Sequence, residues 1–122
     1  MAEQTTLDTL YLVGDTDKNV SLEIIIGDVG QTASSLIAID QEEPKDHEGS
    51  LSETPIGTNR ELSNKVLFIT TTITDTSELS NFTEMIIRLR GGLVFREFHL
   101  SKTVEEDHQS VPYACRIKFL NV

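Results

Sequence analysis

Short β-rich runs that alternate apolar and polar residues recur along this chain at nearly even intervals, and they restrict its fold more than any other feature. Successive side chains of a strand point to opposite faces, so a period of two buries one face and solvates the other. No run has a sustained helical period. We predict seven strands, at 6–13, 20–26, 33–40, 65–74, 82–90, 93–100 and 113–121. Strands with this spacing predict an all-β fold, an antiparallel β-sandwich or open barrel.

The length and the cysteine content fit one domain that needs no disulfide bond for stability. A chain of 122 residues can bury an adequate core, so we expect a single β-sandwich domain over 1–122. Cys115 is the single cysteine, which excludes an internal disulfide, and its alternating run predicts an inward-facing, unreactive thiol. No secretory signal and no long apolar segment is recognised, so a cytoplasmic location is expected.

Gly91 and Gly92 predict the turn of one hairpin. A two-residue type I′ loop needs positive φ at both central residues, which glycine adopts freely. The register that follows has three pairs on its apolar side: Leu89 with Val94, Ile87 with Arg96, and Met85 with Phe98. Arg96 is the charged residue on that side. Either a bulge turns it outward, or its stem lines the core edge with the guanidinium in water, or it holds a carboxylate.

The segment 41–64 is predicted to be a long polar loop. It contains Pro44, Pro55 and a charged cluster, and it has few apolar residues that could pack. We therefore expect that a short linker could replace most of it without loss of the fold. A loop of this length is either a tolerated insertion or a recognition surface. The candidate binding residues are Glu42, Glu43, Asp46, His47 and Glu48, with Arg96 as a sixth.

One turn resembles the opening of a calcium loop. Asp15, Asp17 and Asn19 have the spacing of its first oxygen ligands. However, Val20 occupies the position of the required glycine, and Ile26 that of the closing glutamate. An ordinary polar turn is therefore favoured, with a calcium site built from several loops as the alternative.

Two histidines, His47 and His108, have acidic neighbours. A zinc or iron site could use such residues, but simple strand alternation would place their loops at opposite ends of the sandwich. The common catalytic motifs do not occur in the sequence. We therefore predict no metal, no cofactor and no catalytic residue.

The net charge of the chain disfavours two further functional classes. Twenty acidic and ten basic residues give a net charge of −10, which disfavours binding to nucleic acid or to an anionic membrane. We expect a non-enzymatic protein-binding or assembly module, which contacts another protein or a second copy through a sheet edge or the 41–64 segment. The alternatives are an acidic inhibitor or immunity-type protein that blocks a basic partner, then a calcium-binding β-sandwich or an enzyme.

Overall fold

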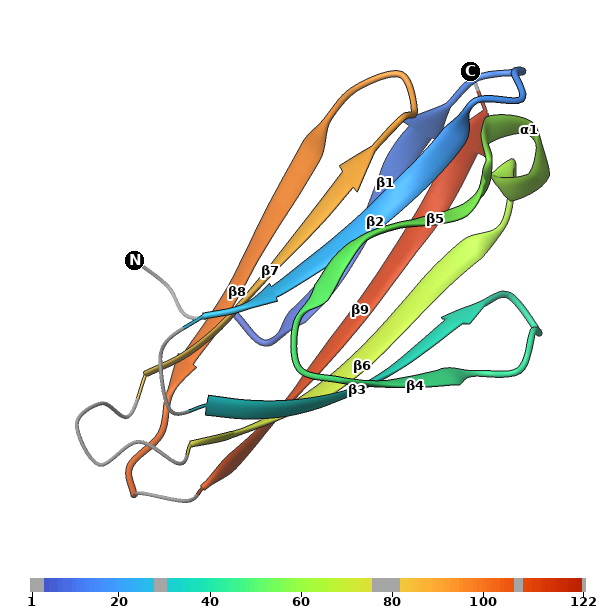
Figure 1. Ribbon diagram of the computed structural model, residues 1–122. Helices are drawn as coiled ribbons and strands as arrows, with labels where there is room; N and C mark the ends of the chain where they lie inside the picture. The colour runs from blue at the N-terminus through green and yellow to red at the C-terminus, as the bar shows by residue number, and fades with distance from the viewer. Residues whose placement is uncertain (1–3, 28–30, 76–81, 107–108, 122) are drawn as a thin grey trace.

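The protein is an all-β sandwich, seen here in a computed structural model that describes residues 4–27, 31–75, 82–106 and 109–121. Two sheets pack against each other without closing into a barrel, which confirms the predicted fold class (Figure 1). The strands found in these residues are β1 (Thr6–Val13), β2 (Asn19–Ile26), β3 (Gln31–Ile39), β4 (Lys45–Glu48), β5 (Leu51–Thr58), β6 (Val66–Asp75), β7 (Phe82–Arg90), β8 (Arg96–Thr103) and β9 (Ser110–Asn121). One short helix, α1 (Asn59–Leu62), follows β5.

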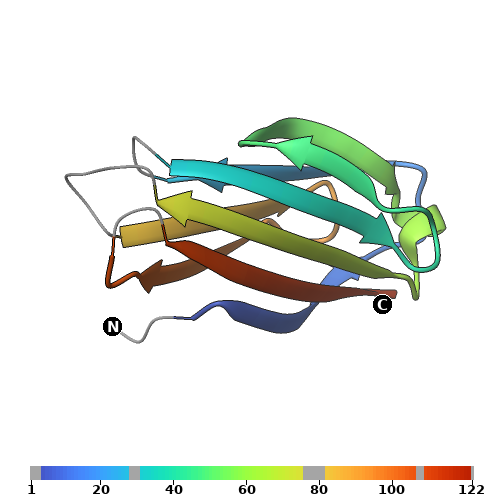
Figure 2. The same ribbon diagram turned by 90° about the horizontal axis from the view of Figure 1, so that it is seen from below.

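The two sheets have different orders and meet at different kinds of edge. The first has the order β1-β9-β6-β3-β4 and the second β5-β2-β7-β8. On one side, Gln4 forms an antiparallel bridge with Ser101 of β8, while β1 pairs in parallel with β9, so the N-terminal segment joins both sheets. The other side is bounded by the edge strands β4 and β5 (Figure 2).

The core comes from the inward faces of the predicted alternating runs. Val20, Leu22 and Ile24 of β2 are buried, and the inward row of β9 from Tyr113 to Phe119 faces them across the sandwich. Cys115 belongs to that row, as predicted. β6 lies between β3 and β9, at the centre of the first sheet. These assignments follow from the period of two, because a row of buried aliphatic side chains removes the most apolar surface from water.

The predicted long loop at 41–64 is wrong, because this segment forms β4, β5 and α1. β4 has four residues, all of them polar or charged, and it pairs with β3 along one edge. Charged residues are common on edge strands, where they discourage pairing with other chains. β5 pairs with β2 at the edge of the second sheet, where Pro55 is tolerated.

The predicted hairpin register is also wrong, although its faces are right. The loop extends over 91–95, and β8 begins at Arg96, which pairs with Leu89 instead of Ile87. A shift of two residues keeps every side chain on its predicted face. Gly91 has a φ of 97°, whereas Gly92 is not among the described residues with positive φ. The Leu93 amide instead donates to the carbonyl of Leu12 on β1 at 3.0 Å.

Candidate binding cleft between β4 and β5

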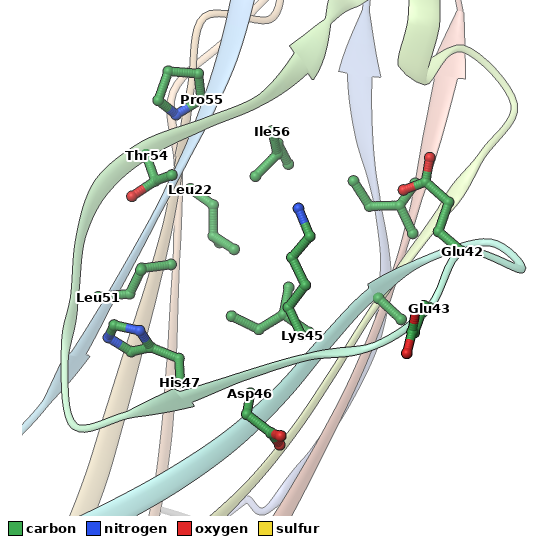
Figure 3. A pocket seen from close by; sticks show the side chains of 13 residues that line it. Leu22, Glu42, Glu43, Lys45, Asp46, His47, Leu51, Thr54, Pro55 and Ile56 are labelled. Atoms are coloured by element: carbon green, nitrogen blue, oxygen red, sulfur yellow. The ribbon is translucent and has the colours of Figure 1, made fainter.

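A cleft of about 290 Å³ opens between the edge strands of the two sheets, and we call it the β4–β5 cleft (Figure 3). Its floor consists of aliphatic side chains, namely Leu22, Ile37, Ile39, Leu51 and Ile56. Its rim carries most of the polar groups, namely Glu42, Glu43, Lys45, Asp46, His47 and Thr54. The site is therefore apolar inside and charged at its mouth.

The cleft exists because the chain leaves one sheet and enters the other between β4 and β5. Gly49 adopts a φ of 76°, which favours glycine, and turns the chain between the two edges. His47 Nε2 donates to the Ser50 carbonyl at 2.8 Å, and Ser50 Oγ accepts from the Ile26 amide at 2.9 Å. These contacts fix the connection against β2. Because β4 and β5 each pair with a different sheet, the apolar groups between them are incompletely covered.

The charged rim groups are available to a ligand. Figure 3 shows the Lys45 side chain directed into the cleft, above the aliphatic floor. Among the residues that the structure describes, no hydrogen bond or ion pair engages the Lys45 ammonium or the side chains of Glu42, Glu43 and Asp46. The mouth thus carries the Lys45 ammonium and the carboxylates of Glu42 and Glu43, whereas Figure 3 shows the Asp46 carboxylate directed away from the cleft.

Most of the sequence-predicted binding residues meet at this cleft. Glu42, Glu43, Asp46 and His47 lie on its rim. Glu48 lines a different pocket, beside Gly49 and Ser50. The sequence interpretation missed Lys45 as a cleft residue, together with floor residues supplied by β2 and β3. Alternation marks those floor residues as buried, but no local signal shows which buried row is left uncovered.

Arg96 lies away from the cleft, on β8, at the other edge of the second sheet. It is half-buried, and its guanidinium carbon lies 5.0 Å from the centre of the Phe98 ring. The guanidinium thus makes a cation–π contact with an aromatic ring of its own strand. No ion pair joins Arg96 to another residue in the described ranges.

The two aspartates of the turn that resembles a calcium loop bind an arginine from α1. Arg60 Nε donates to Asp15 Oδ1 at 3.0 Å, and its NH1 donates to Asp17 Oδ1 at 2.7 Å. These two carboxylates raise the pKa of the Arg60 guanidinium, with the hydrogen bond to Asp15 as the largest cause. A capping box between Thr58 and Glu61 starts α1 and so positions Arg60.

Other chemistry is limited in the described part of the chain. There, no group of three or more His, Cys, Asp or Glu side chains is placed to hold a metal ion, and His108 lies outside the described residues. Burial raises the pKa of the Cys115 thiol to about 12, so it is not an activated nucleophile. Among the described helices, none is both long and apolar enough to cross a membrane.

Comparison with known proteins gives no match to any family model, curated protein or solved structure. The functional argument therefore depends on the β4–β5 cleft and on the surfaces around it.

Proposed function

We propose that the protein is a non-enzymatic binding or assembly module whose β4–β5 cleft takes an apolar side chain from a partner protein. The observation that carries this proposal is the aliphatic floor at an open side of the sandwich. A cavity of about 150 Å³ can hold a benzene ring, and pockets for drug-sized ligands begin near 300 Å³. A volume of about 290 Å³ therefore suits one aromatic or branched side chain better than a large cofactor.

The rim favours a partner with positive charge. The carboxylates of Glu42 and Glu43 and the single Lys45 ammonium leave an excess of negative charge at the mouth, which attracts a basic segment and steers its approach. The carboxylates are exposed, whereas general acid–base catalysis relies on burial to adjust a pKa. A binding role is therefore better supported than a catalytic one. We place the protein in the cytoplasm, consistent with its single, buried thiol.

The same acidic rim also supports the second candidate, an inhibitor of a basic partner. The two functions differ in what holds the complex together. An inhibitor bound by charge loses affinity steeply as salt screens the rim, whereas capture of an apolar side chain in the cleft persists at high salt.

Nuclear magnetic resonance titration tests the proposal with two synthetic peptides, one with a central phenylalanine between arginines and one with the same residue between glutamates. We expect the basic peptide to shift the amide signals of His47, Thr54 and Ile56. The shifts should persist in high salt. If neither peptide moves these signals at millimolar concentration, the proposed function is wrong.

Paired variants test the role of the rim. Glu42→Lys with Glu43→Lys should weaken the basic peptide severalfold, because it reverses charge at the mouth. Glu105→Lys with Glu106→Lys is the matched control, since these adjacent glutamates are exposed and lie outside the residues that line the cleft. Equal loss of affinity for the basic peptide in both double variants would show that the net charge of the protein, and not the rim of the cleft, attracts the peptide.

A further inference from the structure

A second surface feature is an apolar tip on the β7–β8 loop, formed by Leu93, Val94 and Phe95. These three consecutive residues are 53%, 46% and 53% exposed. A run of exposed apolar side chains is unfavourable on a soluble protein unless a contact covers it. The tip therefore indicates an interaction surface.

The fold holds this tip in place. The Tyr11 hydroxyl donates to the Val94 carbonyl and accepts from the Gly92 amide at 3.0 Å. At the base of the loop, Asn59 Nδ2 donates to the carbonyl of Gly91 at 2.9 Å. A loop fixed by such bonds loses little conformational freedom when it binds, and this preorganisation favours affinity.

The charges beside the tip are opposite to those around the cleft. The guanidinium carbon of Arg90 lies 5.1 Å from the centre of the Phe95 ring, although its charge is offset by Glu23 and Glu53. Arg96, at the end of the same loop, has no carboxylate partner among the residues described. The tip is thus an apolar projection next to an uncompensated cation, on a chain whose net charge is −10.

One copy cannot fill its own cleft, because the two features lie at opposite edges. The second sheet has the order β5-β2-β7-β8, so the cleft beside β5 and the tip at the start of β8 are separated by the width of the sheet (Figure 1). We propose that the apolar tip of one copy inserts into the β4–β5 cleft of a second copy. This proposal rests on the proposed function and names its partner, a second copy of this chain.

The contact is head-to-tail, because the tip and the cleft are different surfaces. Leu93 or Phe95 would fill the aliphatic floor, while Arg96 would approach Glu42 and Glu43 on the rim. A head-to-tail contact leaves one free tip and one free cleft at the ends of every open assembly. Growth therefore continues beyond a dimer unless the geometry closes a ring.

Sedimentation measurements from micromolar to millimolar protein test the proposal. The wild type should increase in mass with concentration past the dimer. The tip variant, Leu93→Ser with Phe95→Ser, and the cleft variant, Glu42→Lys with Glu43→Lys, should each require at least about tenfold higher concentration to associate. An equimolar mixture of the two variants should form a dimer and stop there, because it retains one intact tip facing one intact cleft.

Matched controls make the result specific. Leu36→Ser with Phe68→Ser removes the same residue types from the exposed outer face of the first sheet, and it should associate like the wild type, as should Glu105→Lys with Glu106→Lys. A wild type that stays monomeric at millimolar concentration, or a variant mixture that stays monomeric, overturns head-to-tail assembly. The peptide titration would then decide separately whether the cleft binds another partner.

Discussion

Asn59 Nδ2 donates to the carbonyl oxygen of Gly91 at 2.9 Å, which ties the start of α1 to the β7–β8 loop. The same side chain donates to the Lys18 carbonyl at 2.8 Å and accepts from the Gly14 amide at 3.0 Å. Asn59 is 2% exposed, so Asn59→Ala leaves the Gly91 carbonyl and the Gly14 amide without this partner, whereas the Lys18 carbonyl still accepts from the backbone amide of residue 59 at 2.9 Å. We expect a loss of about 2 to 4 kcal/mol in the free energy of unfolding by urea denaturation.

The exposed Asn19 provides the control for this loss. No hydrogen bond from the Asn19 side chain is found in the described part of the chain, so Asn19→Ala should change stability by less than about 0.5 kcal/mol. Similar losses in both variants would contradict the role assigned to Asn59.

Alanine variants of two glycines with positive φ distinguish the effect of steric clash from that of backbone strain. Gly49 has a φ of 76°, and a β-carbon there would meet no atom within 4 Å. Gly91 has a φ of 97°, and its β-carbon would lie 2.0 Å from the Asn19 carbonyl oxygen. Gly49→Ala should therefore cost about 1 to 2 kcal/mol, whereas Gly91→Ala should cost more than about 3 kcal/mol. Equal melting temperatures of Gly49→Ala and Gly91→Ala would mean that the β7–β8 loop can move away from the Asn19 carbonyl and relieve the clash.

The sequence predicts the strands with a buried alternating row better than it predicts the edge strands β4 and β5. β2 and β9 alternate cleanly because one of their faces is buried against the other sheet, and this pattern can be recognised locally. β4 has no such pattern, because an edge strand at the rim of a cleft keeps nearly all of its side chains in water. β4 adopts a strand conformation because it pairs with β3. This pairing cannot be predicted from the residues of β4 alone.

The hairpin and the cleft show how distant contacts override local preference. Gly91 and Gly92 favour a two-residue turn, but the Tyr11 hydroxyl binds the Gly92 amide from 81 residues away and opens the loop. The charged segment 41–64 predicts four rim residues of the cleft, although the sequence predicts a loop there. The aliphatic floor beneath them could not be predicted, because Leu22 and Ile37 belong to different sheets.

Alkaline pH should weaken the fold through Cys115. Burial raises the pKa of its thiol from 9.0 to about 12, so the unfolded chain releases this proton first as pH rises. The contribution of the protonated Cys115 thiol to the free energy of unfolding is therefore complete below about pH 9 and is lost as pH approaches 12. Cys115→Ala should reduce the slope of unfolding free energy against pH in that window. The burial of Tyr11 raises the pKa of its hydroxyl, which should leave part of the slope in the variant. An unchanged slope would contradict the burial of the thiol.

Calcium should not stabilise the protein. Arg60 already binds the carboxylates of Asp15 and Asp17, and a cation would have to displace it. We expect equal melting temperatures in millimolar calcium and in chelator. A ligand that binds the folded state raises its stability by mass action, so an increase of several degrees would reveal a calcium site that competes with Arg60.

Replacement of 42–54 by a short Gly/Ser linker should destabilise the protein strongly, in contrast to the expectation for a polar loop. The segment contains all of β4 and half of β5, and Leu51 packs against the core cluster. Its removal would expose Leu22 and Ile37 on the floor of the cleft to water, which costs several kcal/mol by the area they bury. The control changes the exposed residues Glu42 and Glu43 to Ser, which alters the rim but leaves both strands in place. This control should melt like the wild type. If the linker variant also melts like the wild type, β4 and β5 contribute nothing to stability, and the cleft that they form cannot be a fixed feature of the fold.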